Sequence, residues 1–268
     1  MTEISNNKKS MKNNKKIPLN KLHLIFDLHG VLISKQQMTE KYDKQMVSFL
    51  QKQFKFEKDA AQKAINHANE KWLRFWEEKP VNTKKSILKR YEDANTNWMR
   101  ECLSGRYYWN YNHLAAFLEY HVPTNFCCVY PEMKETLIEL KNKGITLSVA
   151  SSAHTRHTTG VLVGCELLSF FSEIIGLDNT HQLKSNKKFY EILFQIIETP
   201  PENSIYIGNS LSEIHFPKQL GAKTIIVTRE ITFDIASNEH ILKQADLVLP
   251  DLCNLFSILI NKNLILIE

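Results

Sequence analysis

The chain has 268 residues, and its 34 lysines and arginines against 29 aspartates and glutamates give a formal net charge of +5. With 43% apolar and 24% charged residues, the composition is that of an ordinary globular protein with a sizeable core. No apolar run approaches the roughly 18 residues that a membrane helix needs, and the first residues lack the apolar segment of a secretory signal. These features argue against an integral membrane protein and against export.

Cysteine usage favours a reducing compartment. The five cysteines are an odd, scattered set with no CxxC pair and no spacing typical of a zinc site. We interpret them as reduced thiols and expect a cytoplasmic protein, because disulfides persist mainly in oxidising compartments. This argues against the disulfide-scaffold and zinc-ribbon classes.

The N-terminal segment carries most of the net charge. Residues 1–16 hold five lysines against one glutamate, so they account for +4 of the +5. Nucleic-acid binding needs basic residues spread over a folded face, whereas a short Lys- and Asn-rich segment is typical of a solvated leader. We therefore expect residues 1–18 to be a disordered basic tail and expect no nucleic-acid partner.

Short apolar runs alternate with helical patterns along most of the chain. The run at 23–26 stops at Asp27, shortly before Gly30, which indicates a buried strand ending in a turn. Strands that alternate with helices of this length predict an α/β fold with a doubly wound parallel sheet. The later predicted strands are 146–150, 173–177, 205–208, 224–227 and 246–249, and the predicted helices are 133–143, 156–171, 188–198, 212–220 and 240–244.

A helical insertion interrupts this alternation of strands and helices. Apolar residues recur at helical spacing over 61–76 and 87–102. The pattern predicts an all-helical domain at 36–125, inserted between core segments 19–35 and 126–268. All four tryptophans fall inside it; we expect most of them to fill its core, with one or two left as candidates for lining a substrate pocket. They are Trp72, Trp76, Trp98 and Trp109.

Residues that can carry chemistry stand where the predicted strands end. Ligands of an open parallel sheet bind beyond the carboxyl ends of its strands. A carboxylate and a histidine follow the first strand, and two serines follow the second. A lysine follows the third strand, and an amide and a second carboxylate follow the fourth. Such groups at one sheet edge predict an oxyanion or phosphate site. The residues are Asp27, His29, Ser151, Ser152, Lys184, Asn209 and Glu213.

Four segments that contain these residues form an ordered set: LIFDLHGVL at 24–32, LSVASS at 147–152, KSNKKFY at 184–190 and GNSLSE at 208–213. In this order they resemble the four motifs of the haloacid dehalogenase-like (HAD) hydrolase superfamily, which read DxDG[TV], a strand ending in Ser or Thr, KPxPxxY and GDSxxD. The resemblance covers about residues 20–260. It implies a Rossmann-like core with the helical insertion as its cap.

The resemblance implies a role for each of the matching residues. Asp27 would be the nucleophile, which attacks a phosphoryl group to form an aspartyl-phosphate that water then hydrolyses. Ser151, Ser152 and the amides at the start of the next helix would bind the phosphoryl oxygens. Lys184 would neutralise charge on the nucleophile and on the phosphoryl group.

The resemblance also implies a Mg²⁺ ion, bound by Asp27, by the backbone carbonyl of His29 and by the acids of the fourth motif. His29 replaces the second aspartate of the first motif, and its imidazole can serve as acid and base near neutral pH. Asn209 and Glu213 replace the two aspartates of the fourth motif. Because Mg²⁺ favours carboxylate oxygens, we expect it to be weakly bound or absent.

We therefore expect a cytoplasmic HAD-type phosphatase that acts on a small phosphorylated metabolite through Asp27, with no nucleic-acid or membrane partner. One alternative is a binding protein that keeps the fold but has lost catalysis, because three acidic motif positions are altered. Another is a metal-independent, dehalogenase-like hydrolase. Against the latter, no halide-binding arginine can be assigned in the cap.

Overall fold

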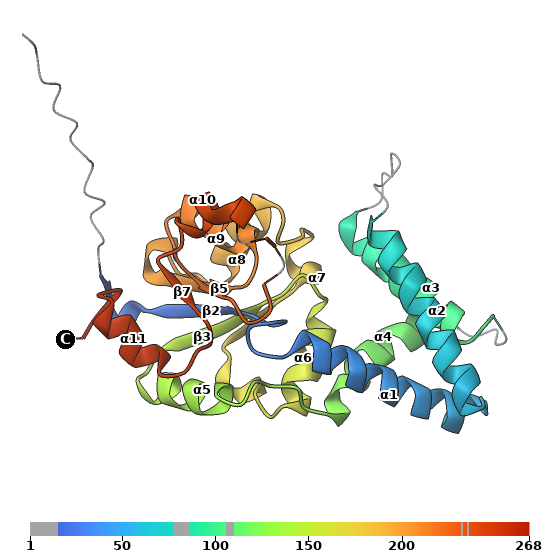
Figure 1. The fold of residues 1–268 in the computed structure, drawn as a ribbon. Helices are drawn as coiled ribbons and strands as arrows, with labels where there is room; N and C mark the ends of the chain where they lie inside the picture. The colour runs from blue at the N-terminus through green and yellow to red at the C-terminus, as the bar shows by residue number, and fades with distance from the viewer. Residues whose placement is uncertain (1–15, 78–85, 106–109, 232, 235, 268) are drawn as a thin grey trace, which may run out of the picture.

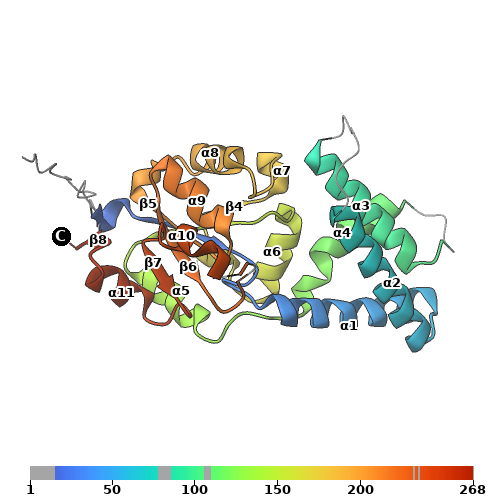
Figure 2. The same ribbon diagram turned by 45° about the horizontal axis from the view of Figure 1, so that its top comes forward.

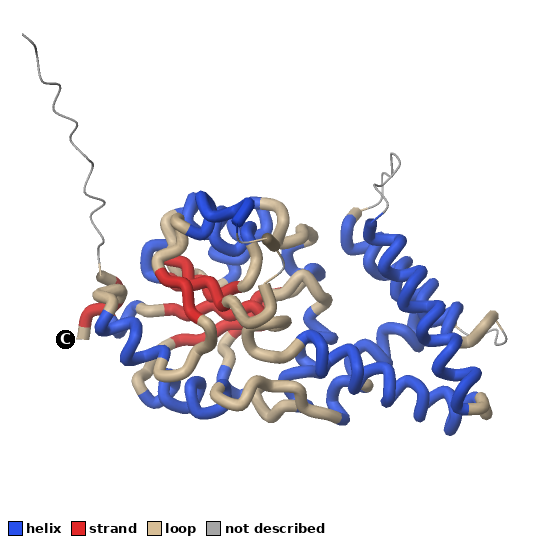
Figure 3. Tube along the Cα trace, in the orientation of Figure 1, coloured by secondary structure: helices blue, strands red, loops and turns tan. Residues whose placement is uncertain are grey.

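The computed structural model describes residues 16–77, 86–105, 110–231, 233–234 and 236–267 (Figure 1). A parallel sheet with helices on both faces forms one part of the molecule, and four helices lie to one side of it (Figure 3). No helix in the described ranges has the length and hydropathy of a membrane span.

Six short segments form the sheet in the order β4-β3-β2-β5-β6-β7, and every neighbouring pair is parallel. Helices cover both faces, so the central strands bury consecutive rather than alternate residues. All five residues of β2 and all five of β5 are buried. The doubly wound parallel sheet predicted from the sequence is confirmed. The strands are β2 (His23–Asp27), β3 (Thr146–Ala150), β4 (Glu173–Ile175), β5 (Ser204–Gly208), β6 (Lys223–Val227) and β7 (Leu247–Leu249).

The two faces of the sheet have separate apolar clusters. Leu24 and Phe26 of β2 pack with residues of α5, α6 and α11, whereas Ile25 packs with residues of α8 and α9. This division follows from the strand itself, because successive side chains point to opposite faces. In Figure 1, α8 and α9 lie above the sheet and α5 lies below it. The helices are α5 (Met133–Asn142), α6 (Thr155–Gly164), α7 (Leu177–Thr180), α8 (Lys187–Ile196), α9 (Leu211–Leu220), α10 (Glu239–Leu242) and α11 (Leu255–Asn261).

Four helices between β2 and α5 make a second body, which we call the cap. Its apolar core includes Met46, Leu50, Ile65 and Met99, all 0% exposed. Figure 2 shows α6 on the side of the core that faces the cap, and α1 running from the core to the far end of the cap. The cap helices are α1 (Lys35–Phe54), α2 (Lys58–Glu77), α3 (Ile87–Cys102) and α4 (Tyr111–His121).

Two predicted segments differ from the structure. The helix predicted over 156–171 ends at Gly164, because Glu166 turns the chain at φ 58° and the amide of Leu167 donates back to the carbonyl of Leu162 at 2.8 Å. Of the predicted disordered tail, residues 1–15 lie outside the described part. Its end, β1 (Ile17–Pro18), pairs with β8 (Ile265–Leu266), since the side chain of Ile17 is buried in the core.

Candidate active site at the carboxyl edge of the sheet

The carboxyl ends of three adjacent strands bring the predicted site residues to one edge of the sheet. β2 ends at Asp27, β3 runs directly into Ser151, and β5 runs directly into Asn209. These strands are neighbours in the order β3-β2-β5 and are parallel, so their ends lie side by side. Lys184, from the loop before α8, completes the group.

Lys184 lies between two buried carboxylates. Its ammonium pairs with Asp27 Oδ1 and, at 2.5 Å, with Glu213 Oε1. The side chains of Lys184, Asp27 and Glu213 are only 13%, 5% and 1% exposed. Taking two carboxylates out of water is costly unless a cation with good geometry compensates them. The lysine is therefore a structural requirement of this site as well as a source of positive charge.

The pKa values of this cluster reflect that balance. Burial raises the pKa of Asp27 to about 7, the Glu213 carboxylate adds to the rise, and the Lys184 ammonium opposes it. Burial lowers the pKa of Lys184, but its two carboxylate partners outweigh burial and leave that pKa raised. Lys184 thus stays charged, and Asp27 titrates near neutral pH.

Glu213 is held by hydrogen bonds at the start of α9. Its Oε2 accepts hydrogen bonds from the backbone amides of Asn209 (2.9 Å) and Ser210 (3.0 Å) and from the Ser210 hydroxyl (2.8 Å). Ser210 and Glu213 form the capping box of α9. The resemblance implies a metal-ligand role for Glu213, whereas Ser-x-x-Glu before an amphipathic helix is also the signature of a capping box, a signal in the sequence that was not used.

Asn209 connects two loops. Its Nδ2 donates to the carbonyl oxygen of His29 at 3.1 Å and to that of Glu230 at 2.9 Å. The Glu230 side chain in turn accepts from the hydroxyls of Ser34 (2.9 Å) and Tyr130 (2.5 Å). Glu230 belongs to no motif and is not among the residues predicted from the sequence. The one feature that points to it is its position three residues after β6, near the carboxyl edge of the sheet.

The groups that were expected to bind Mg²⁺ are engaged with one another. Asp27 and Glu213 share the Lys184 ammonium, and the His29 carbonyl receives an amide hydrogen from Asn209. Within the described ranges, no three or more His, Cys, Asp or Glu side chains gather around a point that could hold a metal. The donor set of this site does not fit a magnesium ion.

His29 faces a second histidine. Its Nε2 lies 3.3 Å from Nε2 of His157, and the two rings are stacked with centroids 5.4 Å apart. Burial lowers the pKa of His29 well below its ordinary value, and the nearby His157 and Lys184 lower it further. Burial also lowers the pKa of His157. Both imidazoles are therefore neutral at pH 7, which leaves His29 able to accept a proton.

The two serines after β3 have different contacts. Ser151 Oγ accepts from the amide of Ala153 at 3.1 Å, and Ser152 Oγ accepts from the amide of Lys184 at 3.2 Å. Ser152 thereby positions the lysine loop. The amides at the start of α6 were expected to bind phosphoryl oxygens, but Thr155 N already donates to Asp178 (2.8 Å) and Arg156 N to His154 (3.3 Å).

A buried carboxylate of the cap reaches the core next to the histidine pair. Glu119 of α4 is 6% exposed, accepts from Arg156 Nε of α6 at 2.5 Å, and also accepts from the Tyr91 hydroxyl of α3. No sequence motif marks Glu119 or Tyr91. Both join the cap to the helix that carries His157.

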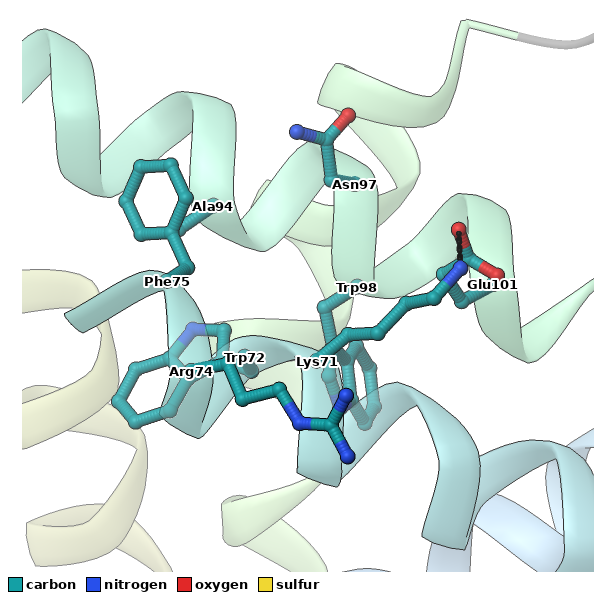
Figure 4. A pocket seen from close by; sticks show the side chains of 8 residues that line it. All are labelled: Lys71, Trp72, Arg74, Phe75, Ala94, Asn97, Trp98 and Glu101. Carbon is teal, nitrogen blue, oxygen red and sulfur yellow. Dashed lines mark ion pairs between the residues drawn. The ribbon is translucent and has the colours of Figure 1, made fainter. Parts of the chain in front are cut away.

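A cavity of about 300 Å³ lies in the cap between α2 and α3 (Figure 4). Trp72 and Trp98 line it, and the Lys71–Glu101 ion pair (2.8 Å) stands at its side. None of the predicted site residues lines this cavity. The fourth tryptophan, Trp109, lies outside the described residues.

Comparisons with known proteins agree with this geometry. The family model described as haloacid dehalogenase-like hydrolase matches residues 24–227. A phosphoglycolate phosphatase from Haemophilus influenzae is 30% identical over 138 residues, which are 50% of this chain and 60% of that protein. The chain thus matches less than two thirds of that relative's length.

Two solved structures share the fold at low identity. YfnB from Bacillus subtilis, bound to magnesium, has a TM-score of 0.60 and 15% identity, covering 91% of this chain and 99% of that one. The 2-haloacid dehalogenase from Pseudomonas syringae has a TM-score of 0.61 and 16% identity, covering 90% and 98%. The ordered motifs, the sheet topology and the family match lead to one conclusion: the chain belongs to the haloacid dehalogenase-like hydrolase family.

Proposed function

We propose that this hydrolase removes the phosphoryl group from a small phosphorylated metabolite by transferring it first to Asp27 and then to water. The observation that carries the proposal is the contact between the Asp27 carboxylate and the buried Lys184 ammonium at the carboxyl edge of the sheet. The phosphatase among its relatives supports the same substrate class. A cytoplasmic setting, favoured by five free cysteines, is part of the proposal.

In the first step an oxygen of ionised Asp27 forms a bond to phosphorus, and the bond from phosphorus to the leaving oxygen breaks; that oxygen keeps the bonding electrons and takes a proton from water. Lys184 neutralises charge on the nucleophile and on the phosphoryl oxygens. Ser151, whose Oγ acts only as an acceptor among the described contacts, has its own proton for a phosphoryl oxygen. Because only the ionised carboxylate attacks, a pKa of about 7 for Asp27 makes this step faster as pH rises through neutrality.

In the second step water attacks the phosphorus of the aspartyl-phosphate, the bond between phosphorus and the Asp27 oxygen breaks to release phosphate, and the water must lose a proton. His29 stands two residues beyond Asp27, and its lowered pKa keeps the ring neutral. A neutral imidazole accepts the proton of the attacking water, which makes His29 the proposed general base.

No step of the proposed reaction uses a metal ion. The sequence predicted Mg²⁺ that is weakly bound or absent, and the engaged donor set around Asn209 supports that prediction. The positive charge near Asp27 then comes from Lys184, which pairs with both acids of the site.

The test is phosphate release from a panel of small phosphate esters by the purified protein and by Asp27→Asn, with and without a chelator. We expect activity that Asp27→Asn reduces at least about 10³-fold, because the nucleophile is lost. Asp59→Asn, which changes an exposed acid in the first turn of α2, is the matched control and keeps full activity. Activity of Asp27→Asn near that of the unsubstituted protein would refute the proposal.

A second candidate function follows from the same donor set. A site without magnesium ligands suits displacement at carbon, the reaction of 2-haloacid dehalogenases, and one such enzyme shares the fold. Chloride release from 2-haloacids in the presence of a chelator, with no phosphate release from the ester panel, selects this function. Stabilisation by phosphate esters without turnover of either substrate class selects the ligand-binding alternative.

A further inference from the structure

Two backbone carbonyls at the site edge share one donor group. The carbonyl oxygens of His29 and Glu230 lie 3.1 Å and 2.9 Å from Nδ2 of Asn209. Asn209 is 6% exposed, so water does not substitute freely for these bonds. Buried carbonyl oxygens need a donor or a cation as partner.

The chemistry of the side chain matches this need. An amide nitrogen carries two hydrogens, one for each carbonyl. The opposite orientation of the amide would turn its oxygen toward two other oxygens, so the contacts fix the orientation. An aspartate at this position has acceptors only, and it would place its carboxylate against both carbonyls with nothing positive between them.

The surroundings fit a close approach by this amide. Gly30 has φ +83°, and a Cβ on it would stand 2.1 Å from Asn209 Nδ2. The remaining acid of the fourth motif, Glu213, is saturated by the capping box of α9 and by Lys184. The other acid of this edge, Asp27, pairs with the same lysine, so the Lys184 ammonium already supplies positive charge to both carboxylates.

We infer that the Asn209 amide takes the place of a divalent cation in this chain: it ties the His29 loop to the Glu230 loop through two hydrogen bonds. The carboxyl edge therefore keeps its arrangement without metal. A carboxylate at position 209 converts the same place into a divalent-cation site, formed with the His29 carbonyl and the Asp27 carboxylate.

The test measures thermal unfolding and calorimetric Mg²⁺ binding, with no use of turnover, so that failure of the proposed function leaves it intact. The unsubstituted protein has the same midpoint in magnesium and in chelator and binds no Mg²⁺. Asn209→Asp has a lower midpoint in chelator and gains about 5 to 10 °C at a Mg²⁺ concentration of about 100 times its Kd.

Two variants separate the charge effect from the loss of donors. Asn209→Ala removes the donors without adding a carboxylate, so its midpoint is lowered equally in magnesium and in chelator. Asn97→Asp adds a carboxylate at an exposed position of the cap and gives no magnesium response.

Either of two results overturns the inference. One is a magnesium-dependent rise of the midpoint in the unsubstituted protein; the other is a folded Asn209→Asp that does not bind Mg²⁺. Should Asn209→Asp not fold, the unsubstituted protein and Asn209→Ala decide. Mg²⁺ binding by the unsubstituted protein refutes the inference. A midpoint of Asn209→Ala that is lowered equally in magnesium and in chelator, with no Mg²⁺ binding by the unsubstituted protein, supports it.

Discussion

The stability of the core should depend on the neutral form of one buried histidine. His23 begins β2 and is 3% exposed. Its two ring nitrogens lie 2.9 Å from the hydroxyl of Thr199 and 2.8 Å from that of Ser148. Burial lowers the pKa of His23 from 6.5 to about 4. A neutral ring has one donor and one acceptor, which these two hydroxyls can both satisfy.

The size of the effect follows from the pKa difference between the two states. Between pH 6.5 and 4 the unfolded chain protonates His23 and the folded chain does not, so stability falls as pH falls. The full shift corresponds to about 3 kcal/mol, of which about 2 kcal/mol is lost between pH 6.5 and 5. Above pH 6.5 this contribution is complete and constant.

Urea denaturation of the unsubstituted protein and of His23→Gln at pH 7.5, 6.5 and 5 measures this contribution. Glutamine keeps a donor and an acceptor but does not titrate, so other groups cancel in the difference. We expect the stability advantage of the histidine protein to shrink by about 2 kcal/mol from pH 6.5 to 5. A difference between the two proteins that does not change with pH would refute the reasoning.

Two further predictions concern the charged groups that join the elements. Lys184→Met should cost about 3 to 5 kcal/mol at pH 7.5, because it leaves Asp27 and Glu213 buried without their cation. Without the ammonium that opposes the rise, the pKa of Asp27 moves further above that of the unfolded chain, so the deficit should shrink as pH is lowered to 5.5; urea denaturation that finds the same deficit at both pH values contradicts this. Glu119→Gln should cost about 1.5 to 3 kcal/mol, because the buried charge accepts bonds from Arg156 and Tyr91. Glu101→Gln, at a surface ion pair, should cost about 0.5 kcal/mol, and equal losses in these two variants would count against the role assigned to Glu119.

Much of the fold and the membership of the site could be predicted from the sequence, because strand ends carry a local signal. The apolar run that stops at Asp27 and the run before Ser151 are visible in the chain, and parallel pairing then fixes where they meet. The end of the helix at Gly164 was less accessible. It depends on the left-handed conformation of Glu166, a residue type that carries no local signal for such a turn.

The contacts of the site residues were harder to predict than their identity. Glu213 satisfies both a degenerate metal motif and a capping box, and residue type alone does not choose between them. Glu230 and Glu119 come from segments without a motif, and tertiary packing alone brings them to the site edge and to the boundary of the cap. Ser210 and Glu213 taken together have the pattern of a helix start, and this pattern predicts the hydrogen bonds between them.

The charge balance at the carboxyl edge links these contacts to the proposed chemistry. Asp27 and Glu213 carry two negative charges when ionised and Lys184 carries one positive charge, while the Asn209 amide that ties the loops adds none. A phosphate ester brings further negative charge to this edge. Its binding therefore favours the state in which the carboxylates hold a proton, and Asp27, with a pKa of about 7, is placed to take one. Substrate affinity should thus improve as pH falls toward 6 while attack by Asp27 slows, and this opposition sets the pH at which such a site works best.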